Sequence, residues 1–277
     1  MNKENFLVDE DVRAFILWLS QKLDGSFKHS YINQKSKKRW ECNSIYTAYT
    51  EYDWPFSMQG FKGHTFDDSA LLLGKLSQQL KDSIDNGDNE KCKETCMLIL
   101  EWGGVLRGND MKIDGLGNAL VDYLKEAKEK LTTGAIEHLS FYQTKDGKPI
   151  YMNAGCTKIY SLYIDDFIIY DSRVGAALGL LVRSFCETDK KDKVPEILAF
   201  AYGNSRGKVN RNPSSEIYKF PLLRSGDKYN NHIENNLKAN WLLTDLLLHS
   251  SSFSKLESTI QLRALESGLF MIGYCCN

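Results

Sequence analysis

The stretch from Met152 to Phe185 most constrains what this chain can fold into. It contains a short helix expected over 157–163, an apolar run, and a second, strongly apolar helix expected over 172–186. Asp171 stands immediately before the second helix. An acid at a helix N-terminus, after a buried entry, can be a plain helix cap or a group that does chemistry. The residues alone leave both interpretations open.

Composition bounds the class of protein. The chain has 277 residues, of which 42% are hydrophobic and 26% charged, as in a soluble globular protein. The net charge of -1 means that any nucleic-acid surface must be a local patch. The seven cysteines form no paired CxxC sets, which favours free thiols in a reducing compartment. The five histidines show no metal-ligand spacing, so we expect neither a metal nor a cofactor.

No membrane segment is expected. The N-terminus has no apolar signal core, and no run approaches the ~18 apolar residues that a span needs. We therefore expect a cytoplasmic protein.

Three-to-four spacing of apolar residues predicts a mainly α fold with few convincing strands. We divide the chain into residues 1–64, an N-terminal helix with an irregular aromatic and basic segment, and residues 65–277, a helical domain. The expected helices lie at 9–23, 65–84, 90–102, 116–131, 157–163, 172–186, 233–249 and 255–273.

Two motifs carry a family resemblance. A turn with Gly155 followed by Thr157-Lys158-Ile159, and then Tyr170-Asp171-Ser172-Arg173-Val174, resembles the helix-hairpin-helix DNA glycosylase superfamily. More closely, IYDSRVGAALGLLV, with WGGV at 102–105 and LRALESGLFMIGY at 262–274, is similar to bacterial proteins with an 8-oxoguanine-glycosylase-like fold. Some of these are associated with phage defence. The closer match spans separated pieces of about two thirds of the chain.

The resemblance implies a helix-hairpin-helix glycosylase-like domain that flips a base out of DNA. Asp171 would be the catalytic carboxylate, which stabilises the positive charge that develops on the sugar. Arg173 is the second candidate catalytic residue and would hold Asp171, a DNA phosphate or a structural acid. Gly155, Thr157 and Lys158 of the hairpin would hold a DNA phosphate.

The hairpin departs from the family pattern. The positions of its usual glycines fall on Ala154 and Cys156, and that of its proline on Asn153. The place of the nucleophilic lysine in bifunctional members is close to Met152, where there is no lysine. We therefore expect a monofunctional enzyme in which water attacks and an abasic site is left.

Other segments could contact DNA. Arg206, Lys208 and Arg211 lie in an acid-free loop over 202–215 that suits phosphate contacts, or is an ordinary solvated loop. The most basic segment runs from Lys28 to Trp40 and is either a second DNA contact or a surface loop.

Three further residues are candidates for a base pocket. Trp54 and Phe56 could stack on an extruded base, although aromatic residues at this density are more often core. Asn109 could read a base edge, or simply follow a helix stop.

The leading hypothesis is a DNA glycosylase of base excision, acting on double-stranded or modified DNA. One version removes a modified phage cytosine in antiviral defence. The alternatives are a non-catalytic helix-hairpin-helix DNA-binding protein and a purely structural or partner-binding helical protein.

Overall fold

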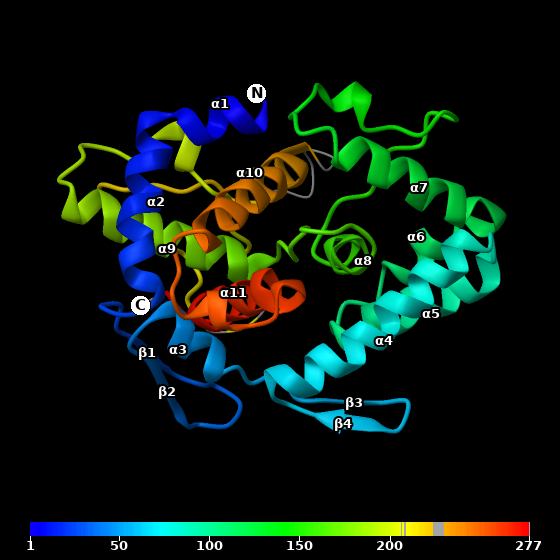
Figure 1. Ribbon diagram of the computed structural model, residues 1–277, viewed down its shortest axis with the longest axis horizontal. Coiled ribbons are helices and arrows are strands. Elements are labelled where there is room, and N and C mark those ends of the chain that lie inside the picture. Colours follow the sequence, from blue (N-terminus) through cyan, green and yellow to red (C-terminus); the bar gives the residue numbers. More distant parts are fainter. Residues whose placement is uncertain (206, 208, 224–229, 277) are drawn as a thin grey trace. The chain divides into compact units, whose positions relative to one another are not determined.

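The structure, a computed structural model, describes residues 1–205, 207, 209–223 and 230–276 (Figure 1). Most regular secondary structure in the described residues is helical, so the predicted mainly α class is confirmed. The α-helices are α1 (Lys3–Val8), α2 (Glu10–Leu23), α3 (Ile45–Thr50), α4 (Phe66–Asp85), α5 (Asn89–Trp102), α6 (Asp110–Asp114), α7 (Leu120–Leu131), α8 (Cys156–Tyr163), α9 (Ser172–Thr188), α10 (Asn230–Leu247) and α11 (Ser258–Ile272).

Two short antiparallel ribbons occur in the segment expected to be irregular. β1 (His29–Ile32) pairs with β2 (Arg39–Cys42), and β3 (Phe56–Met58) pairs with β4 (Phe61–Gly63). Strands of three or four residues are too short for alternating hydrophobicity to reveal them. The same segment contains α3, which a capping box between Ser44 and Thr47 opens.

The chain forms two compact units that do not follow the expected boundary at residue 64. The first unit contains Met1–Asn2 and Trp54–Ile169, and the second contains Lys3–Asp53 and Tyr170–Asn277. The physical reason lies in α2, whose apolar face is buried against α9 and α10 of its own unit. Phe15, for example, contacts the ring of Phe185 at 5.5 Å between centroids. The N-terminal helices therefore share a core with the C-terminal ones.

The first unit is built on the helix pair α4 and α5, with α7 and α8 packed against both. Thr65 and Asp68 form a capping box at the start of α4, and Asp88 caps α5. The predicted end of this helix at residue 102 is confirmed, and Gly104 has a φ of +63° just beyond the end of α5.

The second unit surrounds α9, which packs against α2 and α11 and crosses α2 in the view of Figure 1. The predicted helix over 172–186 is thus confirmed and extends two residues further. Glycines on α9 let the backbone of other segments approach this helix closely. A Cβ on Gly175, for example, would overlap the carbonyl oxygen of Ala201. All seven cysteines are free thiols in buried positions. The described helices include none with the length and hydropathy that a bilayer crossing requires.

Candidate functional site

Asp171 is the N-cap of α9. Its backbone is extended, and its Oδ1 accepts hydrogen bonds from the N–H groups of Arg173 at 2.8 Å and Val174 at 3.0 Å. The side chain is half-buried. The capping interpretation is therefore correct, and it does not compete with a chemical role. The two N–H groups fix the carboxylate in one orientation at the positive end of the helix dipole.

The residue before Asp171 is held from two directions. The hydroxyl of the fully buried Tyr170 donates to the carbonyl of Ala201 at 2.7 Å. His232 donates from Nε2 to the carbonyl of Tyr170 at 2.7 Å. His232 was not among the predicted site residues, because a side chain that contacts a distant backbone carbonyl leaves no motif in the sequence.

Arg173 lies against aromatic rings. Its guanidinium is 4.1 Å from the ring centroid of Phe270 and 4.9 Å from that of Tyr274. Tyr274 stacks on Tyr31 at 4.6 Å, and Tyr31 stacks on Trp40 at 4.7 Å. We call Trp40, Tyr31, Tyr274 and Phe270 the aromatic column. Burial lowers the pKa of Arg173, the positive charge of Arg211 lowers it further, and the negative charge of Asp171 opposes both.

Arg211 reaches the same place from the loop over 202–215. Its Nη1 donates to the hydroxyl of Ser172, the first residue of α9, at 2.7 Å. Among the described residues Arg211 forms no ion pair, and its buried Nε has no hydrogen-bond partner. The second unit thus brings together three predicted site residues: one carboxylate, Asp171, and two guanidinium groups. Arg206 and Lys208 lie outside the described residues.

The predicted hairpin, in the first unit, is closed on itself. Asn153 Oδ1 accepts from the N–H groups of Gly155 at 2.7 Å and Cys156 at 3.0 Å. The N–H groups of Thr157 and Lys158 donate to the carbonyls of Asn153 and Gly155. The backbone donors that the resemblance assigns to a DNA phosphate are therefore already paired within the chain.

The hairpin side chains are also engaged. Thr157 is fully buried, and Lys158 is 6% exposed. Lys158 Nζ donates to the carbonyl of Ala154 at 3.2 Å, and its methylene groups lie against Gly103. In this arrangement Gly155, Thr157 and Lys158 shape the start of α8 and do not present donors to a phosphate.

The proposed base-pocket residues have structural partners in the first unit. Trp54 Nε1 donates to the carbonyl of Trp102 at 3.1 Å, and Phe56 begins β3 half-buried. Asn109 donates to the carbonyl of Val105 at 2.7 Å and accepts from Asn153 Nδ2 at 3.0 Å. The Asn109 amide therefore holds the turn before α8.

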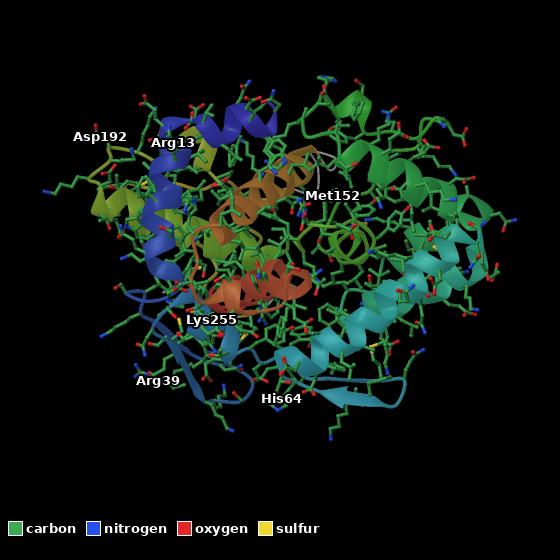
Figure 2. The ribbon with its side chains drawn as sticks, viewed as in Figure 1. Arg13, Arg39, His64, Met152, Asp192 and Lys255 are labelled. Atoms are coloured by element: carbon green, nitrogen blue, oxygen red, sulfur yellow. The ribbon has the colours of Figure 1, made fainter. Side chains whose placement is uncertain are left out.

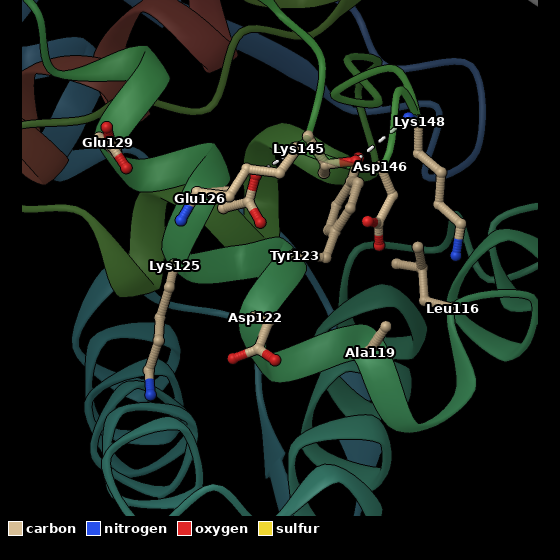
Figure 3. A pocket seen from close by; sticks show the side chains of 11 residues that line it. Leu116, Ala119, Asp122, Tyr123, Lys125, Glu126, Glu129, Lys145, Asp146 and Lys148 are labelled. Atoms are coloured by element: carbon tan, nitrogen blue, oxygen red, sulfur yellow. Dashed lines mark hydrogen bonds between the residues drawn. The ribbon is translucent and has the colours of Figure 1, made fainter.

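A cavity of about 490 Å³ lies in the first unit between α7 and the loop that follows it (Figure 3). Its lining mixes acids and lysines, and the backbone N–H of Lys145 donates to Glu126 Oε2 at 2.7 Å. Neither Trp54 nor Asn109 lines it. A smaller cavity of about 80 Å³ in the second unit, beside Asn231 and Asn235, has room for roughly two or three water molecules.

Comparisons with protein families, with curated proteins and with solved structures found no match for this chain. Among the described residues, no group of three or more His, Cys, Asp or Glu side chains is placed to hold a metal ion.

Proposed function

We propose that this protein is a helix-hairpin-helix DNA glycosylase that hydrolyses the N-glycosidic bond of a damaged or modified base. The observation that supports this best is the carboxylate of Asp171, which two helix N–H groups hold in one orientation. Its charge acts on the guanidinium of Arg173, and Arg211 donates to the neighbouring Ser172. A fixed anion next to two cations suits a substrate that is itself a polyanion and that develops positive charge when it reacts.

The chemistry needs few groups. As the bond from the base to C1′ breaks, positive charge develops on the sugar, and the Asp171 carboxylate stabilises it. Water then adds to C1′, its hydroxyl staying on the sugar and its proton going to solvent or to the leaving base. The product is an abasic site. Arg173 acts as a positioning residue, because its guanidinium is held against aromatic rings.

The absence of a Schiff base is part of the proposal. Met152, near the usual position of the lysine nucleophile, is buried and cannot act as one. The ammonium group of Lys158 donates a hydrogen bond to the backbone carbonyl of Ala154, in the first unit. Hydrolysis by water, without a covalent enzyme–DNA intermediate, is therefore the mechanism proposed for this chain.

The substrate follows from the family resemblance. A modified phage cytosine, such as glucosylated hydroxymethylcytosine, is the specific version that we propose to test first, in a role in antiviral defence. The test uses duplexes with glucosylated hydroxymethylcytosine, 8-oxoguanine or uracil, and detects abasic sites by alkaline strand cleavage.

Asp171→Asn separates capping from chemistry. Asparagine caps helices as well as aspartate does, so we expect no change in thermal unfolding. We expect base release to fall by about 100-fold or more, the typical effect of removing one electrostatic group from a transition state. The matched control is Asp9→Asn, since Asp9 caps α2 through the same two bonds, to Asp11 N at 3.0 Å and Val12 N at 3.2 Å.

Two outcomes would count against the proposal. If Asp171→Asn released bases at the wild-type rate, the assignment of Asp171 would be incorrect. If the wild-type protein bound DNA but released no base from any duplex, the non-catalytic DNA-binding alternative would take its place.

A further inference from the structure

Two segments of the chain are basic and contain no acidic residue: 25–40 and 203–213. Together they hold eight of the 35 Lys and Arg residues and none of the 36 Asp and Glu residues, which leaves 27 basic against 36 acidic residues elsewhere. In this nearly neutral chain, these two segments, far apart in the sequence, therefore carry a net positive charge while the remainder is net negative.

The fold brings the two segments together in the second unit. Tyr31, Tyr274 and Cys275 form a buried cluster against which Trp40 and Val209 pack. Trp40 belongs to the first basic segment and Val209 to the second. Hydrogen bonds tie both segments to the C-terminal residues: His29 Nε2 pairs with the carbonyl of Cys275 at 2.9 Å, and Cys276 N donates to the carbonyl of Asn210 at 2.8 Å. The first segment and the described residues 209–213 of the second thus form one surface.

The β1–β2 hairpin gives this surface a defined shape. Ile32 pairs with Arg39, and Asn33 organises the connecting turn. Asn33 Oδ1 accepts from the N–H groups of Lys35 at 2.9 Å and Ser36 at 3.2 Å, while Asn33 N donates to the carbonyl of Lys38 at 2.9 Å. The backbone of the turn is therefore held by its own hydrogen bonds.

The cations of the hairpin point into solvent. Lys28, Lys35, Lys37 and Lys38 are exposed, and none of them forms an ion pair among the described residues. Arg39, labelled in Figure 2, pairs with Glu41 at 2.9 Å on the exposed face of β2. Four unpaired ammonium groups on an ordered hairpin suit a ligand with regularly spaced negative charges.

The aromatic column links this hairpin to the candidate site. Trp40 and Tyr31 belong to the hairpin strands, Tyr274 stacks on Tyr31, and Tyr274 contacts the guanidinium of Arg173. The hairpin is thus fixed relative to Asp171 within the second unit.

We infer that the β1–β2 hairpin binds the phosphate backbone of DNA and, with the described loop residues 209–213, forms the anchor that holds the strand next to Asp171. The choice of DNA as the polyanion rests on the proposed function. Because the turn before α8 is closed by Asn153, this surface takes the anchoring role that the family hairpin would otherwise have. When lysines bind phosphates they release counterions, so replacing these lysines changes the salt dependence of binding.

The test compares two triple variants of the full chain. The hairpin variant carries Lys35→Gln, Lys37→Gln and Lys38→Gln. The control carries Lys3→Gln, Lys190→Gln and Lys193→Gln, which are exposed lysines of the same unit. Each variant also replaces one lysine with left-handed backbone, Lys37 in the hairpin (φ 59°) and Lys190 in the control (φ 53°), so any backbone effect of the substitution is matched. Base release is measured together with binding of a fluorescent duplex of about 20 bp at about 50 to 200 mM salt, where affinity for phosphates changes steeply.

We expect the hairpin variant to bind at least about tenfold more weakly at low salt, with a salt slope that is shallower by about one for each phosphate that is no longer neutralised. The control variant and a Lys→Arg triple variant of the hairpin should bind as the wild type does. Equal affinity and slope for the hairpin variant and the wild type would overturn the inference. So would a wild-type protein that binds vesicles of anionic lipid but not the duplex. If the hairpin variant binds the duplex more weakly while no base is released even by the wild type, the inference stands and the proposed glycosylase function falls.

Discussion

Gly273 sets how closely α11 approaches α9. It follows the last turn of α11 with a φ of -77°, so alanine is compatible with its backbone. A Cβ at this position would overlap the carbonyl oxygen of Arg173 and lie 2.6 Å from its carbonyl carbon and 3.0 Å from the N of Ala177. Both neighbours are backbone atoms of a buried helix. They cannot rotate away as a flexible side chain would.

The cost of Gly273→Ala can be worked from these distances. Favourable packing between such atoms begins near about 3.5 Å, so α11 and α9 must separate by on the order of 1 Å. Overpacking of this kind costs about 1–3 kcal/mol, and the rigid neighbours place Gly273→Ala at the upper end. For a chain of this size we expect the unfolding midpoint to fall by roughly 3–5 °C. The same movement would draw Tyr274 away from Arg173.

The assay is thermal and urea unfolding followed by circular dichroism. Gly25→Ala is the control within the same unit, because a Cβ on Gly25 would meet no atom within 4 Å. We expect that variant to keep the wild-type stability or to gain up to about 1 kcal/mol. If Gly273→Ala unfolded within about 0.5 kcal/mol of the wild type, the close approach of α11 to α9 would be refuted.

Two further predictions concern stability. Asn153→Ala removes the acceptor for Gly155 N and Cys156 N at the start of α8, and should lower the free energy of unfolding by about 1–2 kcal/mol, measured by urea titration. A decrease below about 0.3 kcal/mol would mean that water replaces this cap. Burial raises the pKa of Asp24, but hydrogen bonds from Ser251, Ser252 and Ser250 outweigh it and hold this pKa below the usual 3.8. Because the folded-state pKa is the lower one, these bonds stabilise the protein above pH 3.8 and lose their effect as the pH falls through the folded-state pKa. Asp24→Asn should therefore be less stable than the wild type at pH 7, and the difference in free energy of unfolding should shrink as the pH is lowered. A difference that stays constant with pH would show that the charge of Asp24 does not contribute to stability.

Local chemistry made part of this molecule predictable. The helix over 172–188 and its cap at Asp171 follow from residues adjacent in the sequence, and so does the glycine stop after α5. The β1–β2 hairpin was not predicted as strands, because its four-residue strands are too short to show an alternating pattern. The contact of Tyr31 with Tyr274, at the other end of the chain, leaves no local signal either.

In the candidate site, too, some features follow from neighbouring residues and others depend on contacts between distant parts of the chain. Asp171 and Arg173 could be singled out from one motif, whereas the arrival of Arg211 at Ser172 depends on the path of a loop. Asn153 was identified only as the position where the family has a proline. Its role as the acceptor that closes the turn before α8 depends on a side-chain orientation that no spacing rule specifies.

The two-unit organisation has a consequence for synthesis of the chain. The first unit is almost entirely an insertion into the second, between Asp53 and Tyr170. The apolar face of α2 leaves the ribosome about 150 residues before α9, against which it packs. At about 5–20 residues per second, this interval lasts roughly 8–30 s. During that time the inserted segment, residues 54–169, can fold before α9 has been made, so the core that α2 shares with α9 is completed after the inserted segment.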